Sequence, residues 1–178
     1  MCAKERLNNI LLSEDISKKI DENLDFILAT IPEILDMIAF EHKNPGHHLD
    51  VYKHTLKALE YSDCDLIVRM SLLLHDIGKP SMYQEIKGTR HFRGHPEESE
   101  KIAKKILKRL DYDKEFISDV CYIVRWHDEK INTKNLDTNI ELIKKRLEVQ
   151  FCDAKAHHPD VVPKRLEMLE KIKEEIYK

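Results

Sequence analysis

The chain has 178 residues, of which 42% are apolar and 35% are charged, with four glycines and six prolines. This balance favours one soluble, largely helical domain with short connections. The net charge of −3, with lysines and acids interleaved, excludes the basic footprint of a general nucleic-acid binder, and no apolar run reaches the roughly 18 to 20 residues of a membrane span.

The four cysteines lie far apart in the sequence, without a C-x-x-C pair or a secretory signal ahead of them. They are Cys2, Cys64, Cys121 and Cys152. This spacing indicates reduced thiols in a cytoplasmic protein.

Residues 1–30 are expected to supply an N-terminal packing helix, and residues 31–178 the rest of one globular unit. Ser13, followed by two acids, is typical of an N-cap and first turn. Apolar residues then recur at helical spacing, at Ile16, Ile20, Leu24 and Ile27. Pro32 opens a second short helix over residues 31–40. We expect packing and no chemistry from this region.

The next helix is predicted over residues 51–61, after an Asn-Pro-Gly turn at residues 44–46. Asp50 is a natural N-cap, and His54 lies one turn inside the helix among apolar neighbours. A single histidine in that setting is more often a satisfied core side chain than a metal ligand. Its interpretation therefore depends on what lies beside it.

A third helix, capped by Ser62 or Asp63, ends in three leucines followed by His75 and Asp76. Gly78 and a proline close it. An ionised aspartate beside three leucines is costly to bury unless a cation pairs with it. The alternative is a helix end whose histidine and aspartate reach solvent.

Residues 79–95 hold most of the loop content and five basic or imidazole side chains. These are Lys79, Lys87, Arg90, His91 and Arg93. They form either a solvated basic loop or a phosphate-binding one. Next, His95 stands at a predicted N-cap, with a proline and acids in the first turn of a helix that runs to Leu110.

Three further helices complete the predicted fold. One covers residues 114–127 and ends at His127, and a closing helix covers residues 161–177. Between them, the helix over residues 138–156 carries Asp153 among small side chains that leave room beside the carboxylate.

Six side chains near element ends or in small-residue surroundings are candidate metal ligands. They are His54, His75, Asp76, His95, His127 and Asp153. Imidazole and carboxylate ligands without thiolate suit Mn, Fe, Co, Ni or Zn, or Mg, rather than a structural zinc knot. Six ligands on separate helices suit one or two divalent ions with positions left for water, which such ions activate for attack on phosphorus.

The ordered motifs resemble a known family. His54, the pair His75-Asp76 and Asp153 are similar to the H…HD…D pattern of HD-domain metal-dependent phosphohydrolases, with HDIG at residues 75–78. The segments at residues 31–34, 48–56, 75–80, 91–95 and 153–156 are similar to the C-terminal HD domain of bacterial CCA-adding tRNA nucleotidyltransferases.

The resemblance implies an all-α fold of seven or eight helices with the metal site between the central ones. It also implies metal binding by the H…HD…D residues, with His95 and His127 completing a second site. The sequence lacks the Gly-Ser loop and paired-aspartate strand of nucleotidyl transfer. We therefore expect a freestanding phosphohydrolase of the phosphatase, nucleotidase or 2′,3′-cyclic phosphodiesterase type.

The expected substrate is a nucleotide or another small phosphate ester. Lys79, His91 and Arg93 are expected to neutralise its oxygens, His48 to orient it, and Asp76 to orient the attacking water. Two alternatives are a non-hydrolytic HD binding module and a di-iron oxygenase, and a homo-oligomer stays open. The other histidines are interpreted as surface or capping residues, at positions 42, 47, 157 and 158.

Overall fold

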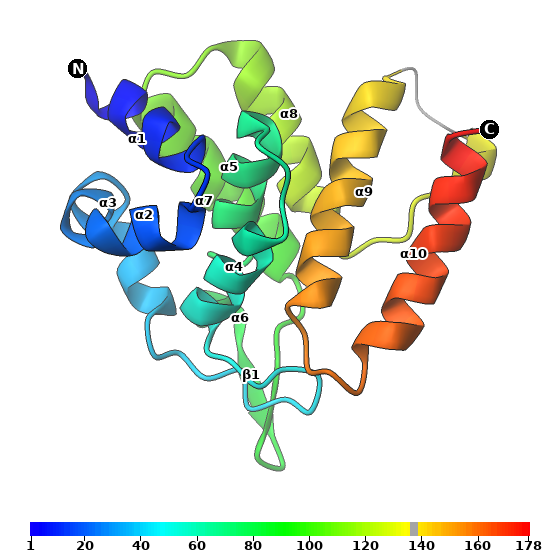
Figure 1. Ribbon diagram of the computed structural model, residues 1–178. Helices are drawn as coiled ribbons and strands as arrows, with labels where there is room; N and C mark the ends of the chain where they lie inside the picture. Colours follow the sequence, from blue (N-terminus) through cyan, green and yellow to red (C-terminus); the bar gives the residue numbers. More distant parts are fainter. Residues whose placement is uncertain (136–138) are drawn as a thin grey trace.

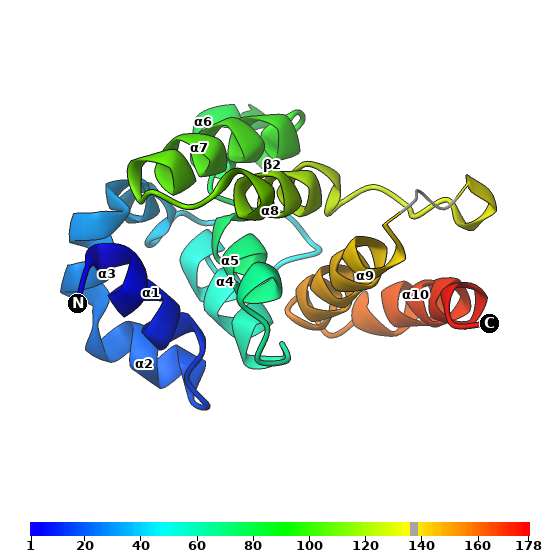
Figure 2. The same ribbon diagram turned by 90° about the horizontal axis from the view of Figure 1, so that it is seen from above.

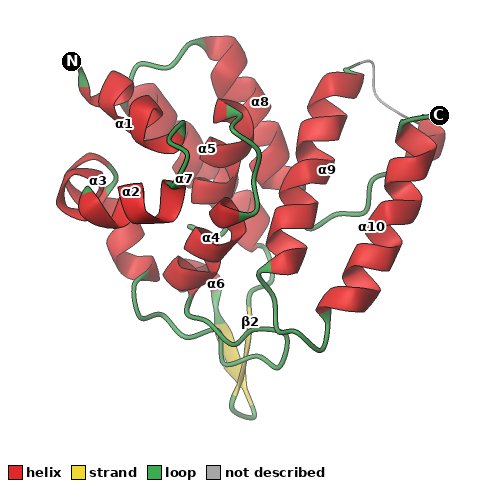
Figure 3. Cartoon of the chain, viewed as in Figure 1, coloured by secondary structure: helices red, strands yellow, loops and turns green. Residues whose placement is uncertain are grey.

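The computed structural model describes residues 1–135 and 139–178. Within these ranges the chain forms ten α-helices, two short 3-10 helices and one two-stranded hairpin. Figure 3 shows how small the strand content is beside the helices. The predicted all-α fold is therefore confirmed. No described helix combines the length and the apolar character that crossing a bilayer requires.

The N-terminal region differs from the single helix predicted for it. It contains α1 (Ala3–Leu11), α2 (Ile16–Glu22) and α3 (Leu24–Thr30). Asn23 divides the last two, because its side-chain nitrogen donates to the Lys19 carbonyl while its side-chain oxygen accepts from Arg6 of α1. The apolar repeat continues across this break, so periodicity alone did not reveal it.

The predicted helix over residues 31–40 is a 3-10 helix, η1 (Pro32–Met37), and it leads into an irregular segment before α4 (Val51–Glu60). Asp50 accepts a hydrogen bond from the Lys53 amide at 2.8 Å, which confirms it as the N-cap. The next helix, α5 (Leu66–Leu74), is capped by Asp65 rather than by Ser62 or Asp63.

Helix α5 lies at the centre of the molecule. Every residue from Val68 to Leu74 is buried, including Arg69 and Ser71, which explains why its apolar residues are not confined to one stripe. Figures 1 and 2 show α4 and α5 between the N-terminal helices and α9. The last residues of α5 therefore deliver the His75-Asp76 pair into the interior.

The predicted loop over residues 79–95 contains a short helix and a hairpin. These are α6 (Lys79–Met82), β1 (Gln84–Ile86) and β2 (Thr89–His91), and the strands pair antiparallel with Glu85 opposite Arg90. Gly94, with φ of 80°, then caps α7 (His95–Arg109). His95 is thus the first helical residue rather than the N-cap, because the left-handed turn favours glycine.

Three of the remaining helices follow the prediction closely, and these are α8 (Lys114–Trp126), α9 (Ile140–Lys155) and α10 (Val162–Ile176). The short 3-10 helix η2 (Thr133–Asn135) was not predicted. The predicted start of α9 at Thr138 lies outside the described residues. Helices α9 and α10 lie side by side (Figures 1 and 2) and share a second apolar cluster that includes Leu147, Leu169 and Ile172.

Candidate metal centre

The structure brings the six candidate ligands together from five helical segments. His54 comes from α4, the pair His75-Asp76 follows α5, His95 starts α7, His127 follows α8, and Asp153 lies in the last turn of α9. Each side chain is buried, with no more than 6% of the residue exposed. Because the chain separates them by up to 99 residues, only the native fold assembles this centre.

The orientation of three imidazoles is fixed by the same local contact. Nδ1 of His75, His95 and His127 lies 2.7–2.8 Å from the backbone carbonyl three residues earlier. A carbonyl only accepts, so each Nδ1 carries a proton, and in the neutral ring Nε2 carries the electron pair that a cation would bind. This second contact of the ring is the usual way in which proteins orient a metal-binding histidine.

Asp76 lies between two pairs of imidazoles, His54 with His75 on one side and His95 with His127 on the other. Its Oδ2 is 3.3 Å from His75 Nε2 and 3.8 Å from His54 Nε2. Its Oδ1 is 3.3 Å from His95 Nε2 and 3.8 Å from His127 Nε2. One carboxylate oxygen therefore faces each group, an arrangement that suits a bridge between two cations.

Asp153 completes the first group. Its Oδ1 is 2.8 Å from His54 Nε2 and 3.7 Å from His75 Nε2. Both ring nitrogens of His54 face groups that only accept, because Nδ1 lies 3.2 Å from the Ala156 carbonyl and Nε2 lies 2.8 Å from the carboxylate. When the proton is on Nδ1, Nε2 directs an electron pair at Asp153. Two acceptors at contact distance repel each other unless a cation lies beside them.

When the rings are neutral, other nitrogen and oxygen atoms of the centre also face one another without a proton between them. Nε2 of His95 and Nε2 of His127 face each other at 3.3 Å. Nε2 of His75 and Oδ1 of Asp76 are buried without a hydrogen-bond partner in the described part of the chain. The residues therefore fit divalent cations in two groups, His54 with His75 and Asp153, and Asp76 with His95 and His127.

The electrostatics of the protein groups point the same way. Burial raises the pKa of Asp76, but the charges of His75 and Lys79 outweigh it and hold that pKa well below its usual range. Burial lowers the pKa of His75, but the charges of Asp76 and Asp153 raise it to about 10. A proton on His75 thus takes the place of a cation when none is bound.

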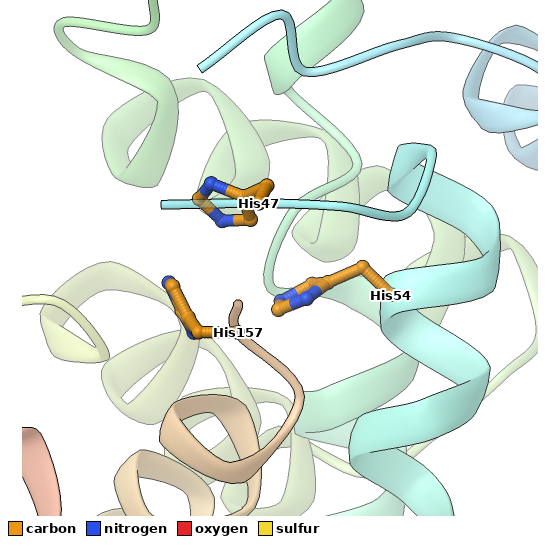
Figure 4. A group of neighbouring side chains, drawn as sticks. All are labelled: His47, His54 and His157. Atoms are coloured by element: carbon orange, nitrogen blue, oxygen red, sulfur yellow. The ribbon is translucent and has the colours of Figure 1, made fainter. Parts of the chain in front are cut away.

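A third group of imidazoles adjoins the centre and consists of His47, His54 and His157 (Figure 4). Two of its three rings are already engaged, whereas both ring nitrogens of His47 are without a hydrogen-bond partner among the described residues. Nδ1 of His157 donates to the Asp153 carbonyl at 2.7 Å, and Nε2 accepts from Arg165 at 2.8 Å. His54 uses its electron pair in the first group. The third group therefore does not offer three free ligands to another cation.

His47 and His157 both line the cavity beside the centre, so neither is simply a surface residue. The interpretation of His157 as a capping residue holds, because its Nδ1 donates to the Asp153 carbonyl in the last turn of α9. His42, interpreted in the same way, is 1% exposed and accepts a hydrogen bond from Lys79. These residues lie in irregular segments, where no periodicity marks which side chains turn inward. The four-residue spacing from Asp153 was a signal for His157, whereas only the high histidine content of the chain pointed to His42 and His47.

The cavity beside the centre has a volume of about 440 Å³. Lys79, His91 and Arg93 line it, as predicted for residues that contact phosphate. His48 does not line it. Its ring packs edge-on against His158, 5.6 Å away, and His47 occupies the position predicted for it. The prediction was therefore wrong by one position, because neighbouring side chains in an irregular segment point in different directions.

Lys79 is more deeply placed than expected for a loop lysine. Its ammonium donates to Asp76 Oδ2 at 2.7 Å and to His42 Nε2 at 3.2 Å, and the residue is 6% exposed. An ammonium has three donors, so one is left for another acceptor in the cavity. Asp128 also approaches the second group, with Oδ2 3.4 Å from His95 Nε2.

Comparison with known proteins adds an independent line of evidence. The HD domain family model matches residues 46–176. An A-adding tRNA nucleotidyltransferase from Deinococcus radiodurans is 30% identical over 133 residues, which cover 70% of this chain and 30% of that protein. A CC-adding tRNA nucleotidyltransferase from Thermus thermophilus is 29% identical over 137 residues, which cover 72% of this chain and 31% of that protein. The chain thus spans less than a third of the length of these relatives.

Proposed function

The chain belongs to the HD domain family, and from that premise we propose that it is a divalent-metal-dependent phosphohydrolase acting on a nucleotide or another small phosphate ester. One observation carries the proposal. Four imidazoles and two carboxylates direct electron pairs into one buried centre, beside a cavity lined by basic side chains. Bound divalent cations would supply an activated water and neutralise charge on the phosphate.

The protein groups have separate roles in this proposal. Asp76 faces both groups of ligands and, when cations are bound, would help to orient the attacking water through Oδ1, which Lys79 does not contact. Arg93, His91 and the third donor of Lys79 bind the phosphate oxygens, because cations fixed beside a developing negative charge lower the energy of the transition state.

Addition of nucleotides to tRNA is not proposed, although two relatives carry that activity in their names. The region of similarity is under a third of each relative. The present sequence also lacks the Gly-Ser loop and paired aspartates that nucleotidyl transfer would require. A purely binding HD module would use the basic side chains at the cavity wall but would not need an open centre for two ions, and a di-iron oxygenase would not need the basic side chains.

The first test replaces Asp76 with asparagine, which keeps the size of the side chain and removes its charge. We expect Asp76→Asn to lower hydrolysis of nucleoside monophosphates, cyclic nucleotides and a generic phosphate ester at least about 100-fold, since a bridging ligand is lost. The helical circular-dichroism signal should remain. Retained turnover with Mn²⁺, Co²⁺ or Ni²⁺ would overturn the metal mechanism, and a wild-type protein that turns over no phosphate ester would favour a binding module.

The second test concerns the cavity wall. Arg93 is exposed and lines the cavity. We expect Arg93→Ala to raise KM about 10-fold or more while the metal content stays unchanged, because a charge-assisted contact to phosphate is lost. His48→Ala is the matched control, since His48 lies away from the cavity and should leave KM unchanged. Equal loss of metal and substrate binding in Arg93→Ala would remove Arg93 from the substrate site.

A further inference from the structure

One basic side chain contacts the metal centre from α10, the helix in which the sequence suggested only packing. Arg165 Nη2 donates to Asp153 Oδ2 at 3.0 Å, and Nη1 donates to His157 Nε2 at 2.8 Å. Asp153 thus presents two different oxygens to two different partners. Oδ1 faces His54 and His75, and Oδ2 is held by the guanidinium.

The other carboxylate of the centre is held in the same way. Lys79 donates to Oδ2 of Asp76 at 2.7 Å, while Oδ1 faces His95 and His127. Each carboxylate therefore has one oxygen contacted by a cationic side chain. In Asp76 that oxygen also faces His75 at 3.3 Å, whereas in Asp153 Oδ2 contacts Arg165 and Oδ1 faces the imidazoles. Lys79 and Arg165 are 86 positions apart in the sequence, so the two contacts do not come from a local repeat.

The contact with Arg165 fixes which oxygen of Asp153 faces the imidazoles. The terminal torsion of an aspartate is broad and close to two-fold, so an unanchored carboxylate can turn and present either oxygen. The side chain is 5% exposed, and water therefore gives little compensation to an oxygen that loses its donor. The planar guanidinium supplies two N–H groups in fixed directions, one for the carboxylate and one for His157.

We propose that Arg165 is a positioning residue that anchors Asp153 and, through it, sets the affinity of the centre for divalent cations. This inference deepens the proposed metal-dependent function. Helix α10 is itself held by an apolar face that contains Leu169, Ile172 and Ile176. Arg165 therefore connects the packing of the last helix to the geometry of the metal centre.

The test measures binding of Mn²⁺ and Ni²⁺ alone to the full chain by titration calorimetry, with no substrate present. We expect Arg165→Gln to weaken binding about 10- to 100-fold, as loss of a contact behind a metal ligand typically does. Arg165→Lys should recover part of the affinity, because it restores one donor. Arg125→Gln is the control, since Arg125 lines the same cavity but pairs with Glu97 and Glu100 instead of a candidate ligand.

The sign of the change separates positioning from charge. Removing a cation beside a metal ligand would by charge alone tighten metal binding, so unchanged or tighter binding in Arg165→Gln overturns the inference. A higher KM at saturating metal with unchanged metal affinity would also overturn it, because Arg165 would then be a substrate contact. If the wild type binds metal but hydrolyses no phosphate ester, the proposed function fails while the calorimetric test of Arg165 still stands.

Discussion

His75 is the residue whose protonation most directly reports on the centre. Burial lowers its pKa, and the charges of Asp76 and Asp153 raise it to about 10. We therefore expect the metal-free protein to carry a proton on His75 at neutral pH, which a cation would displace on binding. We expect metal affinity to rise about tenfold per pH unit between roughly pH 7 and 9, with about one proton released per first ion bound.

Calorimetry in buffers of different ionisation enthalpy measures that proton release. Asp153→Asn provides the comparison, because it removes one of the two charges that raise the pKa of His75. Release of no proton at pH 7 would contradict the assignment of His75 as a ligand that is protonated in the absence of metal.

The six candidate ligands could be predicted from the sequence, whereas their supporting residues could not. His75, Asp76 and His127 follow apolar helices, and a polar side chain at the end of a buried helix has few ways to be satisfied. His47 was missed in favour of His48 because neither lies in a periodic element. Arg165 was missed because an arginine on an amphipathic helix is ordinarily a solvated side chain, and only the placement of α10 turns it towards Asp153.

At the scale of elements, Gly78 sets the distance between α5 and α7. Its φ of −84° is ordinary, so the glycine serves close approach rather than backbone conformation. A Cβ at this position would lie 2.7 Å from the Ser99 amide nitrogen and 2.9 Å from the His95 carbonyl oxygen. The Gly78 amide also donates to Ser99 Oγ at 2.9 Å, which joins the two elements on either side of the ligands.

We expect Gly78→Ala to cost about 1–3 kcal/mol of unfolding free energy, as overpacking usually does, and to weaken metal binding because His95 moves away from Asp76. Denaturant unfolding and metal titration measure the two effects. Gly88→Ala is the control, since a Cβ there meets nothing within 4 Å and the cost comes only from the φ of 79°. Equal metal affinity in the two variants would contradict the role assigned to Gly78.

The elements that build the centre were the predictable ones. Helices α4, α5, α7 and α8 carry clear caps and apolar positions, and their bounds agree with the prediction within a few residues. The N-terminal helices were not resolved by pattern. Helix α1 ends where Arg69 of α5 donates to the Leu11 carbonyl at 2.6 Å, a tertiary contact between residues 58 positions apart. Such contacts decide helix ends and leave no local trace in the sequence.

Across the whole molecule, the metal centre lies where two apolar clusters meet. Helices α4, α5, α7 and α8 belong to the main core, while α9 contributes residues to both that core and the smaller cluster shared with α10. The ligands thus come from both sides of the fold. Since His54 and Asp153 are 99 residues apart, an unfolded chain cannot hold them around one ion, and metal binding must stabilise the native state.

We therefore expect divalent metal to raise the melting temperature. A ligand at 100 times its Kd stabilises the native state by about 2.7 kcal/mol, and each kcal/mol shifts the melting temperature of a domain of this size by about 2–4 °C. The expected rise is roughly 5 to 11 °C over the chelator-treated protein, measured by thermal circular dichroism. Asp76→Asn should lose most of this rise, because the bridging carboxylate is gone, whereas His48→Ala should keep it. If Mn²⁺, Fe²⁺, Co²⁺, Ni²⁺ and Zn²⁺ all leave the wild-type melting temperature unchanged, the buried electron pairs must be satisfied by protons alone, and the metal centre would be excluded.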